Sequence, residues 1–179
     1  MTHRREGSVR SQKRRLVFLS LGLAGALTLL AGAHPAPALA GLGDLRPEVM
    51  AKAQSLRLRL IRTDQREGYS ALSFERSEQL AIPGRPPRTL IVREFLDSGG
   101  RSFAVAWKGS VNPDLSLLLG ELYSHIPPVN RSPARHRLFF QDDRLVISVV
   151  GSSLFQSGAA WDKTRLPQGF SPARIRIAP

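Results

Sequence analysis

The side chains that most often carry enzyme chemistry are scarce in this sequence. None of the 179 residues is a cysteine, which excludes disulfides, thiolate metal sites and cysteine nucleophiles together. Beyond residue 40 the histidines are His125 and His136, and prolines lie between them. That separation is not the spacing of metal ligands on one element. The pattern therefore predicts no histidine metal site.

Adjacent acids and serines offer two weaker candidates. Asp142 and Asp143 lie between two apolar segments, and acids at a strand turn are usually solvated. Ser152 and Ser153 follow Gly151 without the second glycine of a nucleophile elbow. Neither pair is assigned a role.

Two further acids, Glu94 and Asp114, lie in the most regularly patterned part of the chain. They are the first candidates for carboxylate-based catalysis, although a helix start explains Asp114 more simply. General acid–base sites use histidine most often, and the sequence contains no phosphate loop or dinucleotide fingerprint. We therefore assign no catalytic, metal or cofactor-binding residue. A non-catalytic binding or accessory protein is favoured, and a hydrolase with a carboxylate-based site is the alternative.

Residues 1–40 have the pattern of a secretory signal peptide. Residues 1–15 are polar and basic, residues 16–33 are an unbroken run of apolar and small residues, and Ala38-Leu39-Ala40 is a small-x-small motif. We predict cleavage between Ala40 and Gly41, by the general secretory route in preference to the twin-arginine route. An uncleaved signal anchor is the alternative, because the apolar run is at the lower limit for a membrane span. The expected location is periplasmic or secreted, with no transmembrane segment after cleavage.

The strongest strand pattern is at residues 90–107. Residues 90–96 and 102–107 each alternate with the period of a two-faced strand. Asp97-Ser98-Gly99-Gly100 lies between them, and its glycines reach positive φ without penalty. We expect a β-hairpin in which Phe103, Val105 and Trp107 share one face and pack in the core.

A helix is expected directly after this hairpin, over residues 114–123. Asn112-Pro113-Asp114 offers an N-cap side chain, a proline at the first helical position and an acid in the first turn. Four leucines follow at the i, i+3, i+4, i+7 spacing of an apolar helix face: Leu115, Leu118, Leu119 and Leu122.

The flanking sequence predicts further strands and little other helix. We expect a short helix at 47–55 that leads into a strand at 56–60, strands at 69–74 and 158–161, an exposed proline-rich loop at 81–88, a second hairpin at 137–140 and 144–150, and a loose tail at 166–179. The fold class is therefore α+β: a mostly antiparallel sheet of hairpins with one amphipathic helix packed on a face. Four to six strands with one polar face are expected, in one domain over 41–179 whose core covers about 46–167. A β-sandwich is the alternative.

The patterned stretch resembles the family known as domain of unknown function 2844, which comprises small exported bacterial proteins. The residues that match are Val92-Arg93-Glu94-Phe95, Gly100, Phe103 to Trp107, Gly109, Pro113-Asp114-Leu115 and Leu118-Leu119-Gly120. A weaker match continues through Gly158, Trp161 and Gly169. Residues 77–88 look longer than the family's connection, and Val150-Gly151-Ser152 stands where the family has Gly-Gly-His. The resemblance implies export and a shared fold, and no activity.

The chain is basic, with a formal net charge of +12. Residues 1–40 hold six basic residues and one acid, which leaves 20 basic and 13 acidic residues and a charge of +7. Arginine dominates, as codon usage in a GC-rich genome would produce, so nucleic acid is not the expected partner. Gathered on one side, the loop arginines would face an anionic envelope polymer or lipid headgroups; scattered, they would serve only solubility. This candidate basic surface comprises Arg85, Arg88, Arg131, Arg135 and Arg137.

Overall fold

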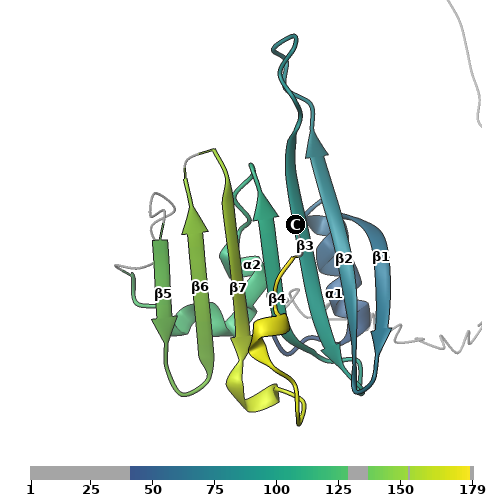
Figure 1. The fold of residues 1–179 in the computed structure, drawn as a ribbon, viewed down its shortest axis with the longest axis vertical. Helices are drawn as coiled ribbons and strands as arrows, with labels where there is room; N and C mark the ends of the chain where they lie inside the picture. Colours follow the sequence, from purple (N-terminus) through teal and green to yellow (C-terminus); the bar gives the residue numbers. More distant parts are fainter. Residues whose placement is uncertain (1–40, 129–136, 153, 178–179) are drawn as a thin grey trace, which may run out of the picture. The chain divides into compact units, whose positions relative to one another are not determined.

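The computed structural model describes residues 41–128, 137–152 and 154–177. Their strands form one antiparallel sheet in the order β1-β2-β3-β4-β7-β6-β5, as Figure 1 shows. The strands are β1 (Arg59–Arg66), β2 (Tyr69–Glu78), β3 (Arg88–Asp97), β4 (Ser102–Gly109), β5 (Arg137–Gln141), β6 (Leu145–Gly151) and β7 (Gln156–Asp162). The helical segments are α1 (Arg46–Ser55), α2 (Leu115–Leu119) and the 3-10 turns η1 (Gly120–His125), η3 (Lys163–Arg165) and η4 (Pro172–Arg174).

Both predicted hairpins are present, as β3–β4 and β5–β6. The strand predicted near residues 158–161 is β7, and it has a central place that the sequence did not indicate. β7 pairs with β4 on one side and with β6 on the other, so it joins the two hairpins into one sheet. The predicted mostly antiparallel α+β architecture is confirmed, with seven strands where four to six were expected.

One face of the sheet is covered by two helical segments. Val49 and Ala53 of α1, and Leu118 and Leu119 of α2, belong to one core cluster with inward side chains of the strands. The expected single helix over 114–123 is instead the five-residue α2 followed by η1. The break lies at Gly120, whose φ of 57° is left-handed, a conformation that glycine adopts without strain.

The start of α2 also differs from the expectation. Asp114, and not Asn112, is the N-cap residue. Its Oδ1 accepts hydrogen bonds from the backbone N–H of Ser116 at 2.9 Å and of Leu117 at 3.4 Å. Two otherwise unpaired donors of the first turn are thereby satisfied, which accounts for this acid without any catalytic role.

The opposite face of the sheet is not polar as predicted, because it carries a second apolar cluster. Phe95 and Phe103 are 1% and 0% exposed there. Phe170 packs edge-on against Phe103, with ring centroids 4.9 Å apart, and Ile175 is buried in the same cluster. The segment expected to be a loose tail thus packs on this face, and Figure 1 shows it crossing the sheet in front of β3 and β4.

Phe103 lies on this second face because of a β-bulge. Phe95 pairs with Ala104 while the next residue, Leu96, pairs with Ser102, so Phe103 is an extra residue in β4. A bulge shifts the alternation of side chains by one position. Val105 and Trp107 face the helices, and the expectation that Phe103 shares their face is wrong.

Within the described residues, no helix is long and apolar enough to cross a membrane.

Candidate functional site

Glu94, the first catalytic candidate, lies in a buried ion pair between β3 and α1. Its Oε1 is 2.5 Å from Nζ of Lys52, and its Oε2 accepts a hydrogen bond from the Ser102 hydroxyl at 2.8 Å. The Glu94 and Lys52 side chains are 1% and 3% exposed. Each charge is compensated by the other, which is the condition for burying either of them. A substrate cannot reach this carboxylate unless α1 moves off the sheet.

Asp44 is the third charged group of this cluster. Its Oδ2 lies 3.9 Å from Nζ of Lys52. Burial raises the pKa of Asp44 to about 6, Lys52 opposes the rise, and Glu94 adds to it. Two carboxylates therefore share one ammonium group, and Glu94 holds the shorter contact.

His125 and Asp142 form a polar pair at the turn between β5 and β6. The imidazole Nδ1 is 2.5 Å from Oδ2 of Asp142, and both side chains are about one-third exposed. Burial raises the pKa of Asp142, but hydrogen bonds from Leu145 N–H, His125 and Arg144 N–H together bring it below its ordinary value. Asp142 is therefore an organised turn residue and not simply solvated. His136 and Ser153 lie outside the described residues.

Ser152 has a structural partner in the β6–β7 turn. Its hydroxyl oxygen lies 3.3 Å from the backbone nitrogens of both Leu154 and Phe155, which donate to it. The described residues contain no group of three or more acids and histidines that could hold a metal ion.

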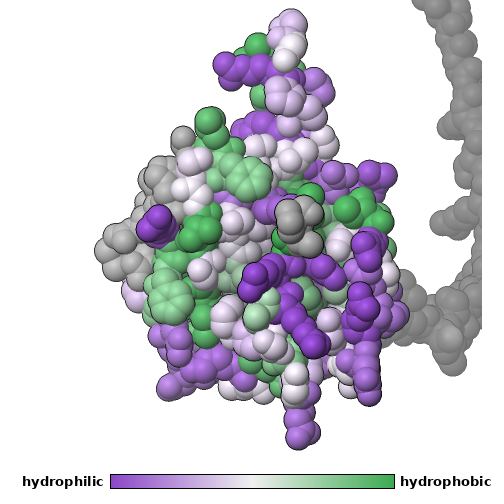
Figure 2. All heavy atoms as spheres, in the orientation of Figure 1, coloured by the Kyte–Doolittle hydropathy of each residue, from purple (hydrophilic) through white to green (hydrophobic). Residues whose placement is uncertain are grey.

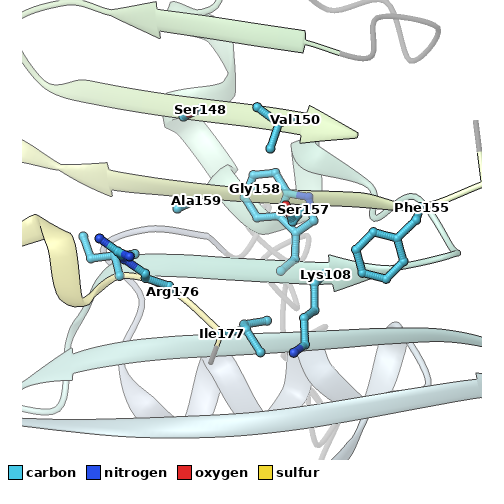
Figure 3. A pocket seen from close by; sticks show the side chains of 11 residues that line it. Lys108, Ser148, Val150, Phe155, Ser157, Gly158, Ala159, Arg176 and Ile177 are labelled. Atoms are coloured by element: carbon cyan, nitrogen blue, oxygen red, sulfur yellow. The ribbon is translucent and has the colours of Figure 1, made fainter. Parts of the chain in front are cut away.

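A surface hollow of about 620 Å³ lies on the sheet face opposite the helices. β6 and β7 contribute small side chains to it, including Ser148, Ser157 and Ala159. Figure 3 shows these strands with Phe155 at one end of the hollow and Arg176 of the C-terminal segment at the other. Its volume is within the range of small-molecule sites.

Residues 38–175 match the family described as "Protein of unknown function (DUF2844)". The chain belongs to this family. The resemblance seen in the sequence is thereby confirmed. No curated protein and no solved structure matches the chain. The DUF2844 match includes the buried ion pair and most of the hollow.

Two buried charged residues of this DUF2844 chain, Lys52 and Asp162, were not among the candidates from the sequence. Lys52 shares a helix face with Val49 and Ala53 at the i, i+3, i+4 spacing, and all three are buried, so the signal was a lysine in an apolar stripe. Asp162 is fully buried at the end of β7 and no local pattern marks it. Its carboxylate accepts from Thr164 at 2.6 Å and from Arg144 at 3.1 Å.

Asp162 organises this corner of the DUF2844 fold. Burial raises the pKa of Asp162, but hydrogen bonds from the Thr164 hydroxyl and N–H, and then from Arg144, bring it below its ordinary value. Arg165 adds a second guanidinium, 3.4 Å from the carboxylate. These contacts fix the C-terminal segment where it leaves β7.

Three of the five arginines of the candidate basic surface are described in this DUF2844 structure. Arg85 is exposed in the β2–β3 loop, and Arg88 donates two hydrogen bonds to the carbonyl of Ser110, at 3.1 and 2.8 Å. Arg137 is exposed at the start of β5. β3 and β5 are four strand positions apart, roughly 19 Å at the usual spacing. Arg131, Arg135 and the predicted cleavage residue Ala40 lie outside the described residues, while Gly41 is buried.

Proposed function

We propose that this DUF2844 protein is an exported, non-catalytic protein that binds or supports a component of the cell envelope. The observation that carries the non-catalytic part is the state of Glu94, which is 1% exposed and neutralised by Lys52. A carboxylate whose charge already stabilises a lysine in the core does not serve as a general base for a bound substrate. Export rests on the signal pattern of residues 1–40.

Fractionation of producing cells tests the location. We expect the protein in the periplasmic or culture fraction, and mass spectrometry of its N-terminus should find Gly41 as the first residue. An intact N-terminus in the membrane fraction, or a cytoplasmic protein, would contradict the proposal.

The alternative is an exported hydrolase, and the His125–Asp142 pair is the observation that favours it. A histidine held by a carboxylate is the arrangement of many general bases. The purified protein should be offered ester, amide and glycoside substrates, with Asp142→Asn and Glu94→Gln variants beside it. We expect no turnover. If the unmodified protein turns over one of these substrates and either folded variant does not, the hydrolase function would replace the proposed one.

A further inference from the structure

Lys52 is a nucleophile buried in the core. Figure 2 shows hydrophilic side chains on the surface of the sheet face opposite the helices, whereas Lys52 of α1 is 5% exposed. Its Nζ lies 2.5 Å from Oε1 of Glu94 and 3.9 Å from Oδ2 of Asp44. Oδ2 of Asp44 is buried and, among the described residues, accepts no hydrogen bond. An amine and a carboxyl group therefore lie close together in a site that is largely closed to solvent.

The backbone holds these two groups in place. The carbonyl of Asp44 accepts a hydrogen bond from the Ser102 N–H at 2.7 Å, and the Asp44 N–H donates to the carbonyl of Gly41 at 3.1 Å. Lys52 lies on the buried face of α1. Groups that a fold holds side by side react as one molecule, at effective concentrations far above those that free reactants reach in solution.

A bond between the two groups would remove charge from the core. Separate ammonium and carboxylate groups are costly to bury, whereas an amide carries no charge. Burial also raises the pKa of Asp44 to about 6, so part of this carboxyl is protonated at neutral pH. The protonated acid is the form that an amine attacks, because its hydroxyl can leave as water.

We propose that Lys52 and Asp44 form an intramolecular isopeptide bond, with Glu94 as the proton acceptor. Glu94 takes one proton from the Lys52 ammonium group, and the freed lone pair on Nζ attacks Cγ of protonated Asp44. The Nζ–Cγ bond forms and the Cγ–OH bond breaks, so that the hydroxyl leaves as water with a second proton from Nζ. The products are one amide and one water, and Glu94 keeps the proton that it accepted.

Ser102 positions the proton acceptor. Its hydroxyl donates to Oε2 of Glu94 at 2.8 Å, which leaves Oε1 directed at Lys52. In the product Glu94 is neutral, so no charge of this group is left in the core without a partner.

The reaction occurs once in each molecule and uses the protein's own side chains, so it does not make the protein an enzyme and is independent of the proposed envelope function. The bond joins the segment before α1 to the helix, in a chain that has no cysteine for a disulfide. Chains that have not reacted keep the free Asp44 carboxyl. The stability of Asp44 and Lys52 variants is therefore compared with unmodified protein that still has its full mass.

Mass spectrometry of the intact chain measures the bond. In the folded protein, as the cell accumulates it, we expect a fraction whose mass is lower by one water than the sequence requires. This fraction should grow during incubation at a rate that does not depend on protein concentration, because the reaction lies within one molecule. It should stop growing in urea, since only the fold brings the three side chains together.

Cleavage after Glu48 shows where the water was lost. Glu48 lies between Asp44 and Lys52 in the sequence, so a glutamyl endopeptidase places these two residues in different fragments. In bonded chains the fragments should stay joined through the side chains. Dehydration of Asp44 to a succinimide also removes one water, but it leaves the fragments separate.

Variants assign the roles. Asp44→Ser and Lys52→Arg should keep their full mass, because each removes one of the reacting groups. Glu94→Gln should slow the reaction by about a hundredfold or more, the usual contribution of a positioned proton acceptor. Asp44 is the most exposed of the three, at 17%, so its variant keeps the test decisive where another fails to fold. Glu75→Gln, in a surface ion pair, is the control and should lose water as the unmodified protein does.

Three results would overturn the proposal. The first is full mass in all folded chains after prolonged incubation, and the second is fragments that separate after cleavage at Glu48. The third is a loss of water that persists in folded Asp44→Ser. Each would leave the proposed envelope function standing, because cell fractionation and N-terminal mass spectrometry test export independently.

Discussion

Lys52 can be buried in this core because Glu94 meets it there. The desolvation of an ammonium group costs several kcal/mol, and a carboxylate at 2.5 Å recovers that cost only when its other oxygen is also satisfied. Ser102 supplies the remaining hydrogen bond. The pair therefore fixes the position of α1 on β3. Removing one partner alone should destabilise the fold, because the other charge then stays buried without its counter-ion.

A double-mutant cycle tests this coupling. Glu94→Gln or Lys52→Met alone should each lower the free energy of unfolding by about 3 to 5 kcal/mol. Lys52→Met leaves Glu94 buried without its cation, and Glu94→Gln leaves Lys52 with only the longer contact to Asp44, at 3.9 Å. The double variant should cost clearly less than the sum of the two. Urea denaturation measures all four proteins. Glu75→Gln is the control, because Glu75 meets Arg59 at 3.4 Å on the surface, where a pair contributes under about 1 kcal/mol. Additive single effects at Lys52 and Glu94 would contradict the coupling.

Asp44 makes the same cluster sensitive to pH. Its pKa is about 6 in the folded protein, against 3.8 for an unperturbed aspartate, so the folded state binds more protons than the unfolded state between these values. Stability contributed by the neutral carboxyl is present below pH 3.8 and is lost as the pH rises towards 6.

The Asp44→Asn variant should therefore lack this loss. Measured by thermal unfolding from pH 4 to pH 7, the unmodified protein should lose stability relative to the variant, by on the order of 1 to 3 kcal/mol. The two curves should be parallel above pH 7. A difference that is constant from pH 4 to pH 7 would show that Asp44 titrates normally.

At the scale of elements, α2 is a five-residue helix that packing stabilises more than propensity does. Isolated helices of this length do not form in water. Leu118 and Leu119 are fully buried against the sheet, and Asp114 satisfies the first-turn donors. The leucine spacing predicted the buried face correctly, but it could not show that the helix changes to a 3-10 turn at Gly120.

Leu118→Ala tests the packing of α2. We expect a loss of about 2 to 5 kcal/mol in the free energy of unfolding, the range for deleting a buried leucine side chain. Leu117→Ala, on the same helix but only partly buried, should cost substantially less. Denaturant titration gives both values. A loss under about 0.5 kcal/mol for Leu118→Ala would remove this residue from the core.

The C-terminal segment is the element that local sequence described least well. Its prolines and sparse apolar residues are typical of a loose tail, yet Phe170 meets Tyr69 at 5.0 Å and Phe103 at 4.9 Å between ring centroids. The partners lie on β2 and β4, more than sixty residues away in sequence, so no local pattern reports the contact. The β-bulge that turns Phe103 towards Phe170 could not be predicted either, because a strict two-residue alternation assumes a strand without an extra residue.

The Phe170→Ala variant tests whether the C-terminal segment is packed on the sheet or is loose. The loss of the aromatic contacts with Tyr69, Phe95 and Phe103 should lower the free energy of unfolding by about 2 to 4 kcal/mol. The control is Arg174→Ala on the same segment, which is exposed and should change stability by under about 0.5 kcal/mol. Equal, negligible effects in both variants would mean that the segment does not contribute to the core.

For the described part of the chain, the strand order determines which strands, and therefore which residues, are neighbours in the sheet. Hairpins β3–β4 and β5–β6 could be predicted because their partners are adjacent in sequence and turn residues mark them. The insertion of β7 between them depends on pairing across about fifty residues with β4, which no turn signal encodes. The hollow on β6 and β7, and the separation of Arg88 from Arg137, both follow from that insertion.

The last prediction concerns the charge of the whole domain. Because β3 and β5 are four strand positions apart, the arginines would act as a broad positive surface and not as a pocket for one phosphate. Binding to anionic vesicles or acidic polysaccharide should therefore weaken steeply between low and physiological salt, where exposed charges are screened within about 8 to 10 Å. Replacing Arg131, Arg135 and Arg137 with serine should abolish most of this binding and leave the thermal midpoint nearly unchanged. An equal number of serines at Arg57, Arg59 and Arg66, on or just before β1 at the edge of the sheet away from β5, controls for net charge alone. Equal loss in both triple variants would show that the arginines act only through total charge, and no retention of the unmodified protein at low salt would end the hypothesis.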